Sequence, residues 1–333
     1  MAEIVLGMGS SHSPMLGSPA ADYRAHAEID QGRTDWKRSL VDIEGNPRSF
    51  EELVAMAPPG LARQLEMDVL EARAARCQDG VAHLARTLEA AALDALIVVG
   101  DDQHEQFTED NMPAILVYWG ETIRNEVLHL PPDSPAWWKR ARSQYHEAEA
   151  PRDYPVAHGL GEHLIGHLVA QDFDLSHSRR LPRDRGEGHA FGFVHRRLMG
   201  ERIVPILPIA MNTYFPPNQP TPRRCLALGA AIRDAVRAWP NEARVGIVAS
   251  GGLSHFTVNE ALDRAVLAAC RARDGAALAA IPENRLRSGS SEIRNWIVVA
   301  AAVDHLDLGW SDYVPCYRSL AGTGMGMGFA VWS

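Results

Sequence analysis

Residues 61–104 read LARQLEMDVLEARAARCQDGVAHLARTLEAAALDALIVVGDDQH, and this stretch decides the fold class. Its first part, 61–92, is rich in Ala, Leu, Glu and Arg with apolar residues at helical spacing, which predicts a long amphipathic helix. The aliphatic run at 95–99 follows and is typical of a buried strand. Polar residues then lead to His104. A helix, a buried strand and a polar turn in this order are the building unit of α/β sheets.

The same pattern recurs along the rest of the chain. Strands separated by helices predict an α/β fold in which a central, mostly parallel β-sheet is flanked by helices. No Gly/Ser-rich or Pro-rich linker divides residues 1–333, so we expect one catalytic domain with insert loops at about 17–60 and 130–160. Loops of this length serve as lids, binding walls or dimer contacts. The other predicted strands are 3–8, 203–210, 245–249 and 329–332, and a tight turn at 322–328 precedes the last of them. The other predicted helices are 223–239, 259–279 and 293–306.

The composition narrows the classes of partner. A formal net charge of −9 argues against nucleic acid or an anionic membrane surface, and favours a small organic substrate. No apolar run is long enough to cross a bilayer, and the N-terminal sequence MAEIVLGMG lacks the features of a signal peptide, so we expect a cytoplasmic protein. The four cysteines are far apart and form no C-x-x-C pair, which excludes a zinc-thiolate motif and a disulfide framework.

His12, His104 and His255 each come a few residues after the end of a predicted strand. Because the carboxyl ends of parallel strands open on one edge of a sheet, we expect these three imidazoles to converge there. Each histidine alone has an ordinary alternative as a helix cap or as the partner of a turn carbonyl. Gly251 and Gly252 admit backbone angles that suit a loop bent to aim His255 into a cleft.

A carboxylate completes such a site if the metal is iron, because two imidazoles and one carboxylate leave open positions for substrate and dioxygen. Glu292 is the candidate, since it precedes the apolar residues of the helix predicted at 293–306. The alternative is an ordinary first-turn glutamate that the helix dipole favours. Glu260, which follows His255 closely, is a second candidate.

An ordered set of motifs resembles the type III extradiol dioxygenases, the family that includes the catalytic β subunit of protocatechuate 4,5-dioxygenase. The similarity spans nearly the whole chain, and the order of the motifs makes it more specific than any one of them. The motifs are SHSP at 11–14, DQH at 102–104, NTYFPP at 212–217, RCLALG at 224–229, GGLSH at 251–255 and GSSEIRNW at 289–296.

The resemblance implies a role for individual residues. His12, His104 and Glu292 match the ligands of iron(II), and His255 matches the acid/base that takes a proton from a substrate hydroxyl. His189 matches the family's other active-site histidine, which contacts substrate and dioxygen. Around His189 the chain departs from the β subunit, because Gly188 stands where that subunit has Asp, and Val-His stands at 194–195 where it has Pro-Leu. His195 is therefore a competitor for this position.

The resemblance also implies the reaction, in which a catecholic ring is opened beside its paired hydroxyls and both atoms of O2 are incorporated. A lignin-derived aromatic acid of the gallate or biphenyl type is the expected substrate, with Arg285, Arg287 and Tyr214 as candidate substrate-binding residues, and Arg294 as a further arginine near Glu292. We expect a homo-oligomer, a dimer, that needs no separate small subunit. Three alternatives remain: another catechol class such as dihydroxyphenylpropionate or a catecholamine, a non-catalytic metal-binding relative, and a zinc hydrolase.

Overall fold

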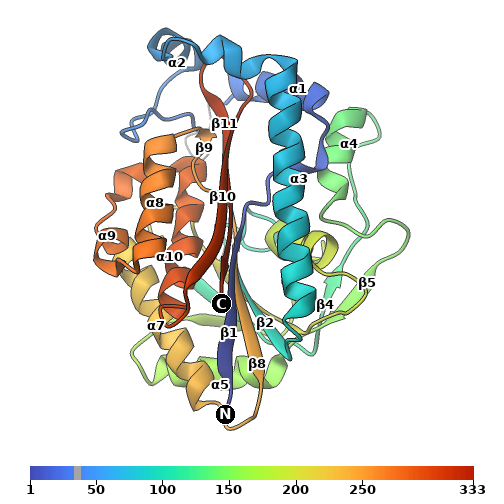
Figure 1. The fold of residues 1–333 in the computed structure, drawn as a ribbon. Coiled ribbons are helices and arrows are strands. Elements are labelled where there is room, and N and C mark those ends of the chain that lie inside the picture. Colours follow the sequence, from blue (N-terminus) through green and yellow to red (C-terminus); the bar gives the residue numbers. More distant parts are fainter. Residues whose placement is uncertain (34–38) are drawn as a thin grey trace.

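The structure, a computed structural model, describes residues 1–33 and 39–333, and these form helices around one large mixed β-sheet (Figure 1). A separate two-stranded sheet pairs β4 (Thr122–Asn125) with β5 (Arg152–Pro155). In spatial order the large sheet contains β10 (Leu308–Tyr317), β11 (Thr323–Trp332), β1 (Glu3–Ser10), β8 (Arg244–Ser250), β2 (Ala95–Asp101), β7 (Ile206–Met211), β3 (Ile115–Tyr118) and β6 (Ser176–Ser178), while β9 (His255–Thr257) pairs with β11.

The centre of the sheet consists of strands that the aliphatic runs predict. β1, β8, β2 and β7 are neighbours and all run parallel. Antiparallel neighbours are added on both sides, because β11 pairs with β1 and β3 pairs with β7. The expected α/β fold with its mostly parallel centre is therefore confirmed, and the antiparallel additions make the whole sheet mixed.

Both faces of the central strands are covered, which explains their continuous apolar sequence. Along β2, Leu96 and Val98 join one apolar cluster while Ile97 and Val99 join the other, as the two-residue period of a strand requires. The first face packs against α3 (Met67–Ala90) and α6 (His189–Phe193). The second packs against α5 (His158–Val169), α7 (Pro222–Ala238), α8 (Glu260–Ala272), α9 (Gly275–Ala279) and α10 (Ile293–Ala302).

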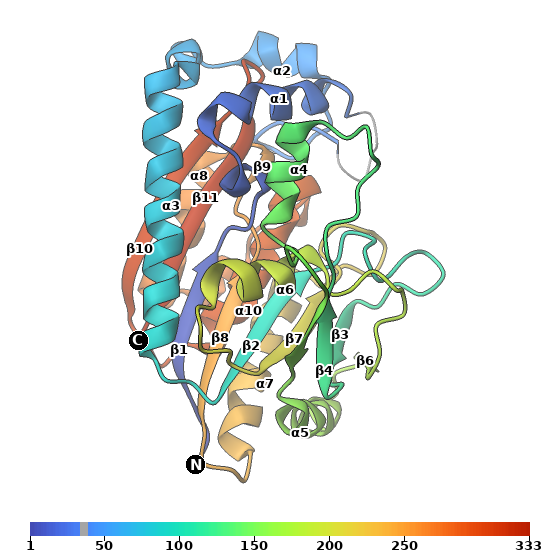
Figure 2. The same cartoon turned by 90° about the vertical axis from the view of Figure 1, so that its right-hand side faces the viewer.

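Three predicted helices are shorter than their patterns, and the simplest case is the 293–306 segment, whose helix α10 ends at Ala302. The 61–92 segment begins with a 3-10 turn at Leu61–Leu65, and α3 then runs along β10 and β11 (Figure 2). The 259–279 segment is divided into α8 and α9 because Arg273 adopts a left-handed conformation with φ of 54°. Other short turns are Pro14–Gly17, Ala20–Asp22, Glu283–Arg285 and Ser288–Glu292, all 3-10, and the π-helical Val194–Leu198.

The segment 322–328 is not the tight turn that its glycines suggest. Residues from Thr323 onward belong to β11, which lies between β10 and β1. Met325 and Met327 point into the cluster under α3, whereas Gly326 and Gly328 lie on the other side. A Cβ atom on Gly326 would lie 2.0 Å from Asp263, and one on Gly328 would lie 2.8 Å from Leu253. The glycines are therefore required for packing within a strand.

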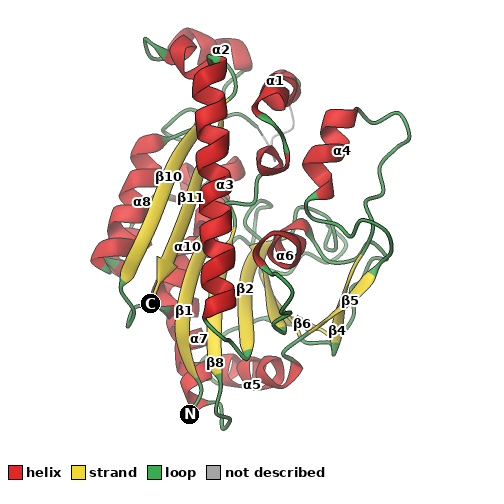
Figure 3. Cartoon of the chain, turned by 45° about the vertical axis from the view of Figure 1, so that its right-hand side comes forward, coloured by secondary structure: helices red, strands yellow, loops and turns green. Residues whose placement is uncertain are grey.

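The two inserts contain helices rather than only loops. The first holds α1 (Tyr23–Gln31) and α2 (Phe50–Met56), and residues 34–38 of it lie outside the described residues. The second holds α4 (Ala136–Ser143) and β5. α1 and α4 lie beyond the carboxyl ends of the central strands, opposite the chain's N-terminus (Figure 3). Among the described helices, none is long and apolar enough to span a membrane.

Candidate active site

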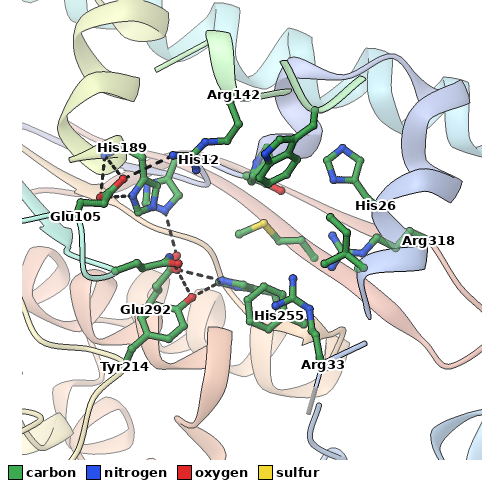
Figure 4. Close-up of a pocket in the computed structure, with 18 residues that line it drawn as sticks. His12, His26, Arg33, Glu105, Arg142, His189, Tyr214, His255, Glu292 and Arg318 are labelled. Carbon is green, nitrogen blue, oxygen red and sulfur yellow. Dashed lines mark hydrogen bonds and ion pairs between the residues drawn. The ribbon is translucent and has the colours of Figure 1, made fainter. Parts of the chain in front are cut away.

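A cavity of about 380 Å³ opens at the carboxyl ends of the central strands. His12, Gln103, Tyr214 and His255 reach it from the segments that follow β1, β2, β7 and β8, respectively. The opposite wall consists of residues from α1 and α4, so both predicted inserts contribute to it (Figure 4). The volume suits a small organic molecule, since ligand cavities generally begin at roughly 300 Å³.

His12 presents one defined nitrogen to this cavity. Its Nδ1 lies 3.1 Å from the hydroxyl oxygen of Ser250, and that hydroxyl donates its own proton to the carbonyl of Ala190 at 2.7 Å. Because the Ser250 proton is already committed, the hydroxyl oxygen accepts from Nδ1–H of His12. The Nε2 lone pair of His12 then faces Asp101 and Glu292, as in a metal ligand whose tautomer is set by a neighbour.

His189 is held in the same way from the other side. Its Nδ1 lies 2.7 Å from Oε2 of Glu105, and the His189 backbone amide donates to both oxygens of that carboxylate at 3.1 Å. A carboxylate accepts from Nδ1–H, so Nε2 of His189 is the nitrogen that is available to a ligand. The rings of His12 and His189 are 4.5 Å apart, centroid to centroid.

Asp101, the last residue of β2, is fully buried beside these two imidazoles. Its Oδ1 lies 3.8 Å from Nε2 of His12, and its Oδ2 lies 4.0 Å from Nε2 of His189. Burial, together with the negative charge of Glu292, raises the pKa of Asp101 well above its usual value. Oδ1 of Asp101 has no hydrogen-bond partner among the described residues. A buried carboxyl in this state ionises readily only when a cation is near it.

Glu292, at the end of the Ser288–Glu292 turn before α10, is the second carboxyl of the site. Its Oε2 lies 3.4 Å from Nε2 of His12 and accepts the backbone amide of Gly252 at 2.6 Å. Burial opposes ionisation of Glu292, but the imidazoles of His255 and His12 outweigh it and hold the pKa well below its usual value. Glu292 is therefore an anion in a buried environment.

These donors suit a divalent metal ion. Two imidazole nitrogens and two carboxyl groups meet at one end of the cavity, and His12, Asp101 and His189 each offer an atom within 4.8 Å of the others. Atoms that bind one ion at about 2.1 Å lie roughly 3 to 4 Å from each other, which matches the distances of 3.4 to 4.0 Å found here. Nitrogen and carboxylate donors favour iron, manganese or zinc over metals that require thiolate.

His255 lies beside this donor set rather than within it. Its Nδ1 lies 2.9 Å from the carbonyl oxygen of Leu253, which can only accept, so the proton of the neutral ring is on Nδ1. Nε2 of His255 is then a proton acceptor that faces Glu292 Oε1 at 3.1 Å and the Tyr214 hydroxyl at 3.0 Å. This geometry is that of a general base whose protonated form is stabilised by an adjacent carboxylate.

His104 is not among the described residues that line the cavity. His104 has a left-handed backbone, with φ of 65°, and its ring stacks on Phe215 at 3.8 Å. Gln103 lines the cavity instead, and its amide donates to Asp101 at 3.2 Å and to Glu292 at 3.3 Å. Neighbouring side chains of a turn point in different directions, so only one of the two residues reaches the cavity. The ligand role expected for His104 stays a prediction that this geometry does not support.

The other predicted residues divide between the cavity and remote positions. His189 and Tyr214 line the cavity, whereas His195 is buried against Tyr154 and bonds to Glu187 at 2.8 Å. Of the two histidines, only His189 is among the described residues that line the cavity, and its role in the site stays a prediction. Glu260 begins α8 and accepts from Tyr317, away from the metal donors.

The arginines near Glu292 in sequence do not line the cavity. Arg285 pairs with Glu44 at 2.7 Å, and both side chains are well exposed. Arg294 is buried and donates to the backbone carbonyls of Pro220 and Leu286 at 2.8 and 2.9 Å, which is a structural role. Arg287 lines an adjoining hollow that shares Tyr214 with the cavity.

Several residues of the site were not predicted. Asp101 and Glu105 flank the DQH motif, and their acidic character beside a strand end is a signal that sequence reasoning could have used. Arg33 and Arg142 lie in the two inserts, and nothing in their local sequence indicates that both face the same space. Their approach depends on how α1 and α4 dock.

Comparison with known proteins agrees with the motifs. The family model of the catalytic LigB subunit of aromatic ring-opening dioxygenase matches residues 74–307. The chain is 37% identical over 114 residues to a gallate dioxygenase of Pseudomonas putida, which covers 33% of this chain and 32% of that protein. It is 29% identical over 166 residues to a 2,3-dihydroxyphenylpropionate/2,3-dihydroxicinnamic acid 1,2-dioxygenase of Comamonas testosteroni, which covers 49% of this chain and 44% of that protein. The chain thus spans less than half the length of these curated relatives. Because the family model covers well over half of the chain, the protein belongs to the family of catalytic LigB subunits of aromatic ring-opening dioxygenases.

Proposed function

We propose that this protein is a non-haem iron(II)-dependent extradiol dioxygenase that opens the ring of a catecholic aromatic acid with O2. The observation that carries the proposal is the convergence of His12, Glu292 and His255 at one end of a cavity that is large enough for a single aromatic ring. The family and the activities for which the two relatives are named agree with this reaction class.

His12 and Glu292 are the proposed iron ligands, with His189 and Asp101 as the nearest further donors. When bound, iron(II) supplies positive charge that acidifies the ring hydroxyls and open coordination positions for substrate and dioxygen. The protein orients its two imidazoles through Ser250 and Glu105, so that the Nε2 atoms of both rings face the same point.

His255 is the proposed base. A catechol hydroxyl has a pKa near 10 when free, so a positioned acceptor is needed at neutral pH. Nε2 of His255 takes the hydroxyl proton, and Glu292 Oε1 stabilises the resulting imidazolium from 3.1 Å. Tyr214 donates its hydroxyl proton to the same Oε1 at 2.6 Å and so fixes the carboxylate next to the base.

The test is anaerobic reconstitution of the purified protein with iron(II), followed by oxygen uptake and absorbance measurements with a panel of catechols. We expect one O2 consumed for each catechol and the appearance of a coloured ring-fission product. The panel contains 3,4-dihydroxybenzoate, gallate, 2,3-dihydroxyphenylpropionate and a catecholamine, so that it separates the substrate classes. Activity with zinc(II) on esters or amides, without oxygen uptake, would replace the proposal by a hydrolase.

The remaining expectations are also open to experiment. A cytoplasmic location and a homodimer stay predictions, which cell fractionation and light scattering after size-exclusion chromatography test directly. Purification of this chain alone tests whether a separate small subunit is needed, because α1 and α4 already wall the cavity.

A further inference from the structure

The end of the cavity away from the metal donors is lined by guanidinium groups (Figure 4). Arg318 makes a two-pronged pair with the buried carboxylate of Asp30, through Nε and Nη2 at 2.7 Å each. Arg33 donates to the same carboxylate through Nε at 2.8 Å. Asp30 therefore already serves two cations, and the cluster of Asp30, Arg33 and Arg318 carries a net charge of +1.

No neighbouring histidine changes this balance at neutral pH. His26 lies on the same wall and bonds to the Ser18 hydroxyl at 2.9 Å. Burial and the positive charge of Arg318 lower the pKa of His26 to about 3, so its ring is neutral. Among the described residues, this charge of +1 has no further carboxylate partner. A buried positive charge is costly unless an anion approaches it.

Arg33 is the member of the cluster that is directed towards the reacting end. Its guanidinium carbon lies 3.6 Å above the ring of Phe256, and the Phe256 ring makes an edge contact with His255 at 5.2 Å. One aromatic ring thus separates the Arg33 guanidinium from the proposed base. The Arg33 side chain is 16% exposed, and among its described hydrogen bonds the donor is Nε, which leaves the Nη groups of the fork for a ligand in the cavity.

The second insert supplies another cation to the cavity. Arg142 of α4 lines the cavity, and its guanidinium lies near the rings of Trp138 and Tyr145, at 5.8 and 5.2 Å. Its nearest carboxylate is Glu105 at 3.8 Å, which is already bonded to His189 at 2.7 Å. The pairing of Arg142 with Glu105 is therefore loose, and the cavity receives cationic groups from both inserts.

We propose that Arg33 binds the carboxylate of the substrate and that Arg142 adds a second positive charge, so that these two residues determine the specificity for a catechol bearing a carboxylate. This deepens the proposed function and rests on it for the orientation of the ring. With the hydroxyls at His12, Glu292 and His255, the carboxylate projects towards the Arg33 fork, which matches a carboxylate in two-pronged geometry. The recognition site is thus built by Arg33 of the first insert and Arg142 of the second, and not by the arginines near Glu292.

The first experiment measures binding without turnover. Calorimetry measures the binding of two ligands to the whole chain in the absence of oxygen. The first, 4-hydroxybenzoate, has a carboxylate but no paired hydroxyls, and the second, phenol, has neither. We expect 4-hydroxybenzoate to bind, and Arg33→Gln to weaken it about 10- to 100-fold, the loss expected for a charged hydrogen-bonded pair. Arg33→Lys, which keeps the charge but loses the fork, is expected to lie between the two. Arg140→Gln on α4, whose partner Asp22 lies outside the cavity, is the matched control and should bind like wild type.

The second experiment separates recognition from folding. For Arg33→Gln we expect kcat/KM for 3,4-dihydroxybenzoate to fall about 10- to 100-fold while kcat/KM for plain catechol stays unchanged. A 2,3-dihydroxyphenylpropionate arm shows whether the carboxylate on a short side chain reaches the same fork. Equal losses for catechol and its carboxylated analogues, or no loss for any of them, overturn the proposal. If the protein binds 4-hydroxybenzoate through Arg33 but opens no catechol, the proposed function fails while the carboxylate site stands.

Discussion

The hydroxyl of Tyr214 lies 2.6 Å from Oε1 of Glu292, and the same oxygen is 3.1 Å from Nε2 of His255. One carboxylate therefore joins the proposed metal end of the site, through Oε2, to the proposed base, through Oε1. Tyr214 comes from the loop after β7, whereas Glu292 precedes α10. The two residues are 78 positions apart in sequence and meet only in the folded chain.

Replacing Tyr214 tests how much this hydrogen bond contributes to catalysis. In Tyr214→Phe, Glu292 loses a donor while the ring that packs in the site is kept, so we expect kcat to fall roughly 10- to 100-fold. Iron content, measured by atomic absorption, should stay at the wild-type level. A shift of the pH–rate profile would locate the effect at the base, and an unchanged kcat would show that Tyr214 only fills space.

We expect His189, but not His104, to contribute to metal binding. Nε2 of His189 faces Asp101 and His12, whereas His104 stacks on Phe215. After anaerobic loading and gel filtration, we expect His104→Ala to retain iron and His189→Ala to lose most of it. His12→Ala and Glu292→Ala serve as the reference for loss. Full iron content in His189→Ala together with loss in His104→Ala would restore the ligand set that the sequence suggested.

Ser250 sets the tautomer of His12 without being a ligand itself. Its hydroxyl accepts from Nδ1–H while donating to the Ala190 carbonyl. Ser250→Ala removes this constraint, and we expect iron affinity to fall about 10- to 100-fold in a competition titration with a chelator. Ser143→Ala, which removes an exposed serine hydroxyl of α4, is the control and should titrate as wild type. Equal affinities for the two variants would contradict the role given to Ser250.

Gly229 of α7 packs tightly against the backbone of α10. A Cβ atom there would lie 2.0 Å from the carbonyl oxygen of Val298, which is backbone and cannot rotate away. We therefore expect Gly229→Ala to lower the free energy of unfolding by about 1 to 3 kcal/mol. Gly166→Ala in α5 meets nothing within 4 Å, and should raise the free energy of unfolding by roughly 0.5 to 1 kcal/mol. Urea denaturation of both variants measures these changes in the free energy of unfolding. An unchanged stability of Gly229→Ala would contradict the tight packing at this position.

The local sequence predicts correctly the strands whose apolar pattern reflects burial on both faces. The aliphatic runs that became β1, β2, β7 and β8 are apolar on both faces, because both faces of the sheet are covered by helices. The Gly-Met alternation of β11 predicts a turn, and this prediction is wrong. Glycine is needed there because side chains of other elements, including Asp263 and Leu253, leave no room for a Cβ atom.

The sequence by itself determined the α/β fold and indicated that His12, His255 and Glu292 follow or precede elements that end at one edge of the sheet. The tertiary structure decided which of Gln103 and His104 faces the cavity, since a single backbone angle directs one side chain inward and the other against Phe215. It also decided that Arg33 lines the cavity. That outcome depends on how the inserts dock against the sheet, and docking is governed by contacts between residues distant in sequence, which no local pattern records.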